Sequence, residues 1–282
     1  MPPVIDRLAA ALLAAIASFA LMAALTSEAA ASQSDSAILV LIPQKRVAAP
    51  AYDEKIARDL SRINDLSIGL VSATQGSYVA AQALLDISQG TRVSRSTYDP
   101  KDVPPVRLLP TSGGSARIRG WQAILDRADT APQTIEPGLL AGSIPGGAGY
   151  VASGIKPGDM AIPATDRKGN IASVRSTGSL DLANTALAQA EKHGLVVVSV
   201  SAGRNGLREL RQLTRGRQPG QLVIAMQAPP EAAIIPLLPI GVAGLADQPS
   251  GLTSDSTNLP NLVAGIDIGP TVLDHLGLET PD

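Results

Sequence analysis

The chain alternates short, continuous apolar runs with segments in which apolar residues recur every three or four positions. Continuous runs are typical of strands buried on both faces of a parallel sheet, and the longer period is typical of amphipathic helices. The predicted strands are 37–42, 67–71, 195–200, 222–226, 238–242 and 262–266. The predicted helices are 52–63, 79–87, 118–128, 182–193, 207–213 and 270–277. Strands that alternate with helices predict an α/β/α sandwich around a mostly parallel sheet.

Two stretches rich in glycine, proline and serine interrupt this pattern, and we expect loops at 99–114 and 137–158. The glycines of 142–149 could bind an anion through their backbone N–H groups. This segment has neither the lysine of a phosphate-binding loop nor the G-x-G-x-x-G spacing, so a plain turn is favoured. In the helix expected at 118–128, Trp121, Ile124 and Leu125 should point inward.

The N-terminus has the pattern of a targeting segment. Arg7 precedes an apolar run from Leu8 to Leu25, and Ala29, Ala30 and Ala31 follow it. This pattern predicts a secretory signal, either cleaved or retained as a signal anchor, over residues 1–31. Residues 32–282 should then form one α/β domain outside the cytoplasm, secreted or held at the cell membrane.

Composition narrows the function classes. Hydrophobic residues make up 45% of the chain and charged residues 17%, as in a globular protein. The net charge of −2 gives no support for nucleic-acid binding. The absence of cysteine excludes disulfides, thiolate metal sites and cysteine nucleophiles.

The most specific motif lies near the C-terminus. Residues 267–277 read D-I-G-P-T-V-L-D-H-L-G, with Pro270 suited to a first helical turn and Gly277 to a left-handed stop. The pattern D-I-x-P-T-x-L-D-x-L-G resembles the late strand–helix unit of the alkaline phosphatase and sulfatase superfamily. Other segments follow that superfamily's order, including 80–92, which resembles its nucleophile helix. The resemblance implies an alkaline-phosphatase-like fold and is strongest to bacterial members outside the cytoplasm.

The resemblance also implies where an active site should stand. Members hold two divalent cations with carboxylates and imidazoles, and these cations activate a Ser or Thr nucleophile. The corresponding positions of this chain carry other residues: Pro43 and Gln44 after the first strand, Ala80 at the nucleophile, Ser201-Ala202-Gly203 after the central strand, Gln227-Ala228-Pro229-Pro230 in place of Asp-His, and no histidine in 245–264. The sequence therefore predicts the scaffold without catalytic or metal-binding residues and without a cofactor.

The only two histidines are expected at the surface. His193 should cap the end of a helix, and His275 should be solvated or lightly paired on an outer helix face. Asp255 and Asp267 are the acids nearest the expected site, too few for a metal centre, and a turn or cap role explains Asp267.

Hydroxyl residues also precede the predicted nucleophile helix. Thr74, Ser77 or Tyr78 could supply a displaced nucleophile, but capping of the helix by Ser77 is favoured.

The densest basic cluster lies in the helix predicted at 207–213. Arg208, Arg211 and Arg215 share one face, while Leu207, Leu210 and Leu213 occupy another. A solvated face is the simpler interpretation. The sharper one is contact with anionic lipid headgroups at a membrane surface or with a cell-envelope polymer.

These observations lead to a main hypothesis and two alternatives. The main hypothesis is a non-catalytic, alkaline-phosphatase-like extracytoplasmic domain with a binding or structural role. The first alternative is a metal-dependent phosphoric or sulfuric ester hydrolase with a rearranged active site. The second is a C-terminally truncated chain, because members of the superfamily usually continue past the motif at 267–277.

Overall fold

The computed structural model describes residues 35–44, 52–72, 80–154, 158–230, 237–245 and 251–280. The chain from Asp35 to Asp282 forms one compact unit. The predicted signal segment, 1–31, lies outside the described residues. Among the residues that are described, no helix has the length and apolar character needed to cross a membrane.

A mixed sheet organises this unit, and its strand order is β11-β2-β10-β9-β1-β8-β5-β7. Its strands are β1 Ser36–Ile42, β2 Ser67–Ser72, β5 Gly149–Ser153, β7 Ser173–Thr177, β8 Leu195–Ser199, β9 Gln221–Gln227, β10 Leu238–Ala243 and β11 Leu262–Ala264. β10 runs antiparallel to both of its neighbours, and every other pairing in this sheet is parallel. The mostly parallel sheet predicted from the apolar runs is therefore confirmed.

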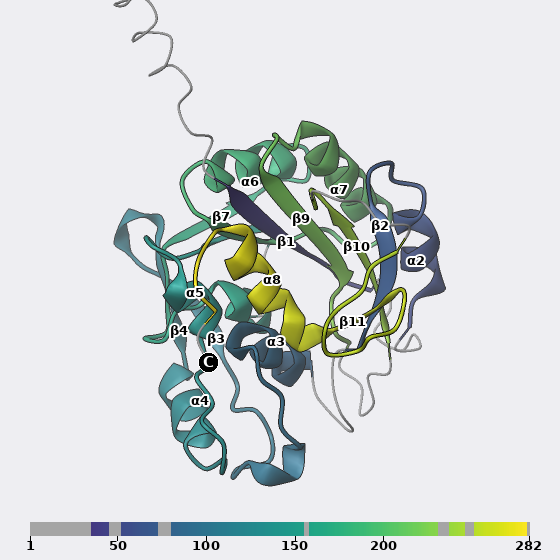
Figure 1. Cartoon of the computed structure of the whole chain (residues 1–282). Coiled ribbons are helices and arrows are strands. Elements are labelled where there is room, and N and C mark those ends of the chain that lie inside the picture. The colour runs from purple at the N-terminus through teal and green to yellow at the C-terminus, as the bar shows by residue number, and fades with distance from the viewer. Residues whose placement is uncertain are drawn as a thin grey trace, which may run out of the picture. The chain divides into compact units, whose positions relative to one another are not determined.

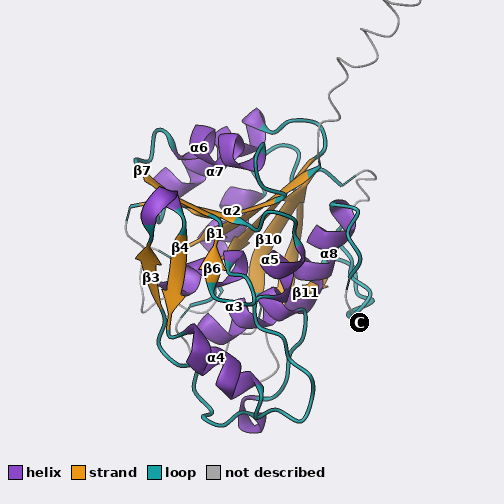
Figure 2. Cartoon of the chain, turned by 90° about the vertical axis from the view of Figure 1, so that its left-hand side faces the viewer, coloured by secondary structure: helices purple, strands orange, loops and turns teal. Residues whose placement is uncertain are grey.

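Helices cover both faces of the sheet, which confirms the α/β/α sandwich (Figures 1 and 2). One face carries α2 Glu54–Leu60, α6 Leu182–Ala190 and α7 Arg204–Gly216. The other carries α3 Ala80–Gln89, α5 Leu139–Ser143 and α8 Ile268–His275. β1 serves both layers because its side chains alternate: Ile38 and Val40 pack toward α7, and Leu39 and Leu41 toward α3.

A small second sheet lies beside the α3 layer, with strand order β3-β4-β6. Its strands are β3 Arg107–Pro110, β4 Ala116–Arg119 and β6 Asn170–Ile171. Helix α4, Trp121–Ala128, follows β4 directly. Short 3-10 segments complete the described chain: η1 Arg95–Thr97, η2 Ser112–Gly114, η3 Gly158–Ala164 and η4 Gly265–Asp267.

The single helix predicted at 118–128 is wrong in its first part, because residues 116–119 form β4. The chain turns at Gly120, whose φ of 90° is left-handed and where a Cβ atom would lie 2.6 Å from the carbonyl oxygen of Pro105. The expected burial holds for Trp121 and Ile124, and Leu125 is partly buried against the same core.

Both predicted loops contain regular structure. β3 lies within 99–114, and α5 and β5 lie within 137–158. The plain turn expected at 142–149 is confirmed only for its middle, where Gly146 and Gly147 both have positive φ. β5 and β7 escaped prediction because glycine, serine and arginine break their apolar pattern.

The C-terminal motif forms the helix that it predicts, although α8 begins at Ile268, two residues before Pro270. The helix ends as expected at Gly277, whose φ is 66°. The N–H groups of Gly277 and Leu278 donate to the carbonyls of Asp274 and Leu273, each at 2.9 Å, which is the paired bonding of a Schellman end.

Candidate functional site

The site implied by the sequence lies where the parallel strands end. At this edge Gln227, the last residue of β9, is fully buried, and its Oε1 accepts from the backbone N of Asp53 at 3.0 Å. Pro43 and Gln44 follow β1, and Ala80 opens α3 in a buried position. Among the described residues, no group of three His, Cys, Asp or Glu side chains is arranged to hold a metal ion.

Segments that follow β1, β2, β9 and β10 in the sequence lie outside the described residues: 45–51, 73–79, 231–236 and 246–250. They include Thr74, Ser77 and Tyr78, so neither the displaced nucleophile nor the Ser77 cap is tested. By sequence, these segments contain the acids Glu231 and Asp247 and no histidine.

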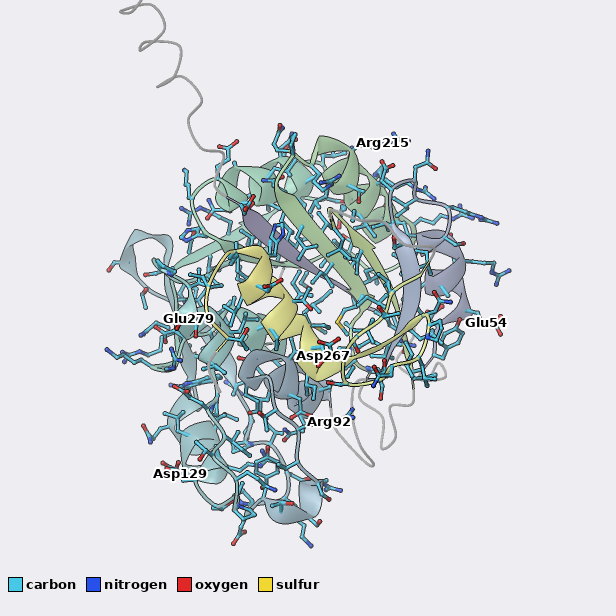
Figure 3. All side chains as sticks on the ribbon, in the orientation of Figure 1. Glu54, Arg92, Asp129, Arg215, Asp267 and Glu279 are labelled. Atoms are coloured by element: carbon cyan, nitrogen blue, oxygen red, sulfur yellow. The ribbon has the colours of Figure 1, made fainter. Side chains whose placement is uncertain are left out.

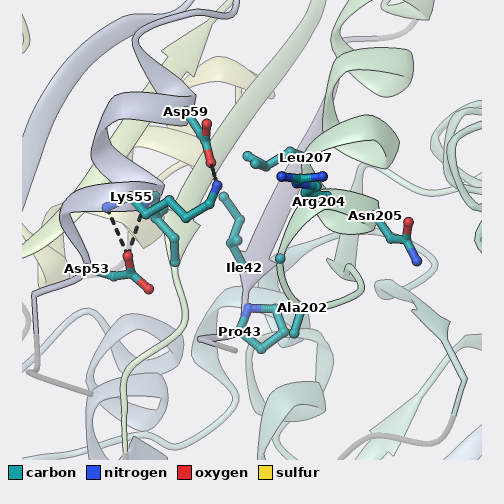
Figure 4. Close-up of a pocket in the computed structure, with 11 residues that line it drawn as sticks. Ile42, Pro43, Asp53, Lys55, Asp59, Ala202, Arg204, Asn205 and Leu207 are labelled. Atoms are coloured by element: carbon teal, nitrogen blue, oxygen red, sulfur yellow. Dashed lines mark hydrogen bonds and ion pairs between the residues drawn. The ribbon is translucent and has the colours of Figure 1, made fainter. Parts of the chain in front are cut away.

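An open pocket of about 590 Å³ lies beyond the ends of β1 and β8, between the first turns of α2 and α7 (Figure 4). On the α2 side of the pocket, the charged side chains are already paired within the helix. Asp53 caps α2 by accepting from the N–H groups of Lys55 and Ile56, and the Lys55 ammonium pairs with Asp59. Arg204 lines the α7 side. The pocket thus offers mixed charge and few free acceptors, a poor environment for a divalent cation.

A cluster of three serines and one glutamate lies at the ends of β5 and β8. The Glu209 carboxylate of α7 is fully buried and accepts from the backbone N and the Oγ of Ser201, each at 2.7 Å, and from the Oγ of Ser179. The Ser201 Oγ also lies 2.8 Å from the Oγ of Ser153. Because Ser201 donates to Glu209, Ser153 must donate to Ser201.

This serine–glutamate cluster stands where the sheet changes direction of winding. The chain leaves β8 toward β9 and leaves β5 toward β7 on the other side, and ligands of open α/β sheets bind beyond the strand ends at such a point. A carboxylate is too weak a base to deprotonate a serine efficiently without further help. The arrangement therefore suits holding the α7 turn in place better than activating a nucleophile.

Close approach of α7 to β8 depends on Gly206. A Cβ atom at this position would lie 1.9 Å from the carbonyl oxygen of Ser201. Sequence reasoning missed the serine–glutamate cluster. The available signal was Glu209 itself, the one acid in a helix otherwise charged by arginines.

A second buried carboxyl lies on the opposite face of the sheet, in α3. Asp86 is fully buried, and its Oδ1 accepts from Gln82 Nε2 at 2.7 Å and Gln89 Nε2 at 3.1 Å. Its Oδ2 has no hydrogen-bond partner among the described residues. Burial raises the pKa of Asp86 from its usual 3.8 to about 8, although Gln82 and the charges of Arg127 and Arg92 act in the opposite direction.

Tyr98 and Arg127 close this region. The guanidinium carbon of Arg127 lies 3.6 Å from the centroid of the Tyr98 ring. Arg127 also donates to the carbonyls of Pro100 and Lys101 at 2.9 and 3.0 Å. Arg127 is thus held by backbone and ring contacts, and its positive charge opposes the rise in the pKa of Asp86.

The predicted arginine contacts lie together on the outer side of α7. Arg208 and Arg215 are exposed and Arg211 is half-buried, while Leu207, Leu210 and Leu213 are buried below them. Figure 3 shows Arg215 at the outer side of the α7 layer, away from the sheet. Arg208 donates to Asn205 Oδ1 at 3.1 Å.

The two histidines differ from each other. His275 is lightly paired, as expected, with its Nε2 3.1 Å from the carbonyl oxygen of Gly220. His193 is not simply a surface cap. It follows the end of α6, its Cδ2 would lie 3.4 Å from a Cβ atom at Gly149, and burial lowers its pKa.

Asp255 and Asp267 line one pocket of about 340 Å³ together with Asp274. Asp267 occupies the N-cap position of α8, at the helix start seen in Figure 3, but its side chain makes no capping bond. Instead its Oδ1 accepts from Ser256 Oγ at 2.6 Å. The turn role predicted for Asp267 fits this contact.

Comparisons with known proteins address the fold. No protein-family model matches the sequence, and no curated protein matches it. The structure is similar to the PH0037 protein from Pyrococcus horikoshii, with a TM-score of 0.50, 11% identity, and coverage of 88% of this chain and 98% of that one.

Two further solved structures are similar at lower scores. The lipoteichoic acid synthase LtaP from Listeria monocytogenes has a TM-score of 0.44 and 11% identity, over 89% of this chain and 74% of that one. The PsFucS1 sulfatase from Pseudoalteromonas sp. has a TM-score of 0.42 and 10% identity, over 91% and 70%. Identities of this size speak to the fold and to no activity. The similarity to the PH0037 protein shows that the chain shares its α/β fold.

Proposed function

We propose that this protein is a non-catalytic, alkaline-phosphatase-like domain that acts outside the cytoplasm in a binding or structural role. The observation that carries the proposal is the set of side chains at the ends of β1, β8 and β9. Pro43, Gln44, Ser201 and Gln227 stand there, and a site for two divalent cations needs several carboxylates or imidazoles at such positions.

Three carboxyl groups of the described residues near this edge already have partners. Glu209 accepts from Ser179 and Ser201, Asp59 pairs with Lys55, and Asp53 caps α2. Recruiting any of them to a cation would break contacts that hold α2 or α7. The chemistry of the donors thus favours a binding module over a metallohydrolase.

The location outside the cytoplasm is supported by the sequence of the N-terminus. Arg7, the apolar run from Leu8 to Leu25 and the alanines at 29–31 form the pattern of an export signal. The binding role is assigned to Arg208, Arg211 and Arg215, which present positive charge to anionic lipid or to an anionic envelope polymer.

The test is metal analysis combined with turnover. The purified full chain is dialysed against zinc, manganese or magnesium, its bound metal is measured by mass spectrometry, and hydrolysis of an aryl phosphate and an aryl sulfate is followed. We expect no stoichiometric metal and no turnover above that of the buffer. Bound metal together with turnover would overturn the proposal.

The alternative, an ester hydrolase with a rearranged site, has one observation in its favour. Ser153, Ser201 and Glu209 are joined by hydrogen bonds at a point of the sheet where ligands commonly bind. If turnover is found, Ser153→Ala decides whether this cluster is responsible. Turnover that Ser153→Ala abolishes, in a variant with unchanged circular dichroism, assigns the reaction to this hydroxyl.

A further inference from the structure

The α6–α7 layer differs in charge from the rest of the surface. The exposed side of α7 carries Arg204, Arg208, Arg211 and Arg215, and the one acid of this helix, Glu209, is fully buried. The neighbouring α6 contains no charged residue. The surface made by these four arginines, called the arginine face below, therefore has a local positive charge on a chain whose net charge is −2.

Ion pairing does not cancel this charge. Within the described part of the chain, no salt bridge involves Arg208, Arg211 or Arg215. Two acids, Asp181 and Glu191, flank the neighbouring α6 at its two ends. The arginines thus outnumber the acids of this layer.

The basic residues of α2, in the same layer, are paired. Lys55 contacts Asp59, Arg58 contacts Glu54 at 4.0 Å, and Arg62 contacts Asp59 at 4.0 Å. Helix α2 has two basic residues balanced by two acids, whereas α7 has four arginines and one buried acid. α2 is neutral along its length, and α7 is not.

An exposed apolar side chain lies one residue from the segment that bonds to Glu209 of α7. Leu180 is 72% exposed and directly follows Ser179, whose hydroxyl donates to Glu209 of α7. Positive charge next to an exposed leucine is the composition of surfaces that lie in the headgroup region of a membrane.

The start of the domain lies at the same edge as the end of α7. Ser36 N donates to Gly220 O, and Gly220 comes four residues after α7 ends at Gly216. In the sequence, the ten residues 26–35 separate the apolar run from β1. Ten residues span at most about 35 Å when fully extended.

We infer that the arginine face docks on the surface of an anionic lipid bilayer, with Leu180 inserted among the headgroups. The inference rests on the proposed binding role and names its partner. Seven residues separate Arg208 from Arg215, so the three charges extend over roughly 10 Å along the helix. That length suits several lipid headgroups at once.

The experiment uses the absence of cysteine in the chain. Gln212, exposed on α7, is replaced by cysteine and labelled with an environment-sensitive dye. Gln133→Cys is the control position, in an exposed loop beyond α4, and α4 packs into the core on the other face of the sheet. The full chain is reconstituted in phosphatidylcholine vesicles with and without phosphatidylglycerol, and quenching of the dye by a headgroup-linked quencher is measured.

We expect quenching of the dye at 212 only in vesicles that contain phosphatidylglycerol, and none at 133. Replacing Arg208, Arg211 and Arg215 by Gln should reduce the ratio of docked to undocked protein by about a hundredfold, at roughly a factor of five per arginine. The matched control replaces Lys55, Arg58 and Arg62 by Gln and should leave quenching unchanged. A triple Arg→Lys variant, which keeps the charges, should also be quenched.

Equal quenching in neutral vesicles, or quenching that persists in the triple Gln variant, would overturn the inference. So would a dye that stays unquenched in anionic vesicles but responds to a soluble glycerol phosphate polymer, which would assign the face to an envelope polymer. These results are separate from metal binding and turnover, which decide the proposed function.

Discussion

The two faces of the sheet each bury a carboxyl group, and the groups are treated in opposite ways. Glu209, in the α7 layer, receives three hydrogen bonds, two of them from Ser201. Asp86, in α3, receives two on a single oxygen, and its pKa rises to about 8. One fold thus contains a buried carboxylate with matched donors and a buried carboxyl that holds its proton at neutral pH.

The difference shows where each layer draws its stability. Donors that match a buried carboxyl group tie together the segments that supply them. A carboxyl with too few donors instead favours the neutral form, because burial penalises the charge. Removing Glu209 should therefore break the contacts that join β7, β8 and α7. Replacing Asp86 by a neutral residue should instead stabilise the layer that contains α3.

The largest effect is expected from Glu209→Ala. The change leaves the donors of Ser179 and Ser201 buried without an acceptor, so the free energy of unfolding should fall by about 3 to 5 kcal/mol. Urea unfolding followed by circular dichroism measures this. Glu191→Ala, at an exposed position just after α6, is the control and should leave the midpoint unchanged. A small change in Glu209→Ala would mean that the cluster does not stabilise the fold.

The next largest effect concerns Asp86, whose replacement should raise the free energy of unfolding. Because the native pKa is raised, the native state binds the proton more tightly than the unfolded chain, which titrates near 3.8. Stability from this group is therefore full below pH 3.8 and is lost as the pH rises to about 8.

Asp86→Asn should remove this loss, and at pH 8 the variant should be more stable than the native chain by an amount on the order of a few kcal/mol. Urea midpoints measured across this pH range test the expectation, with Asp129→Asn at an exposed position as the control. Parallel pH profiles of the native chain and Asp86→Asn would show that Asp86 is ionised at neutral pH.

The smallest expected changes in the free energy of unfolding test the order in which the hydroxyls of Ser153 and Ser201 donate hydrogen bonds toward Glu209. Ser201→Ala removes one donor to Glu209 and should cost about 1 to 2 kcal/mol, whereas Ser153→Ala should cost about half as much or less, because Ser153 reaches the carboxylate only through Ser201. Both values come from the same urea measurements. A larger loss in Ser153→Ala than in Ser201→Ala would contradict this arrangement.

Much of the fold was predictable because its central strands are continuous apolar runs. β1, β8 and β9 are buried along their whole length, which leaves a plain signal in the sequence. The sequence did not predict β5 and β7, because glycine, serine and arginine interrupt their apolar pattern. Their strand conformation depends on pairing with neighbouring strands. The helix at 118–128 was predicted too long because its first residues belong to strand β4, which ends before Gly120.

The candidate site was predictable only in part. The residues at the ends of β1 and β9 followed from the order of segments, but the buried carboxyls did not. Glu209 is satisfied by Ser179, 30 residues away, and Tyr98 comes within 3.5 Å of Gln82 across 16 residues. Such partners are brought together by the tertiary fold, and local periodicity carries no trace of them.

The glycine at position 206 links the buried and the exposed sides of α7 mechanically. Since the Ser201 carbonyl leaves no space for a methyl group there, any other residue would lift the helix from the sheet. That displacement would carry the surface arginines outward and pull Glu209 from its donors in the same movement. A single mutation at this small, buried glycine would therefore change both the arginine surface of α7 and the hydrogen bonds of Glu209.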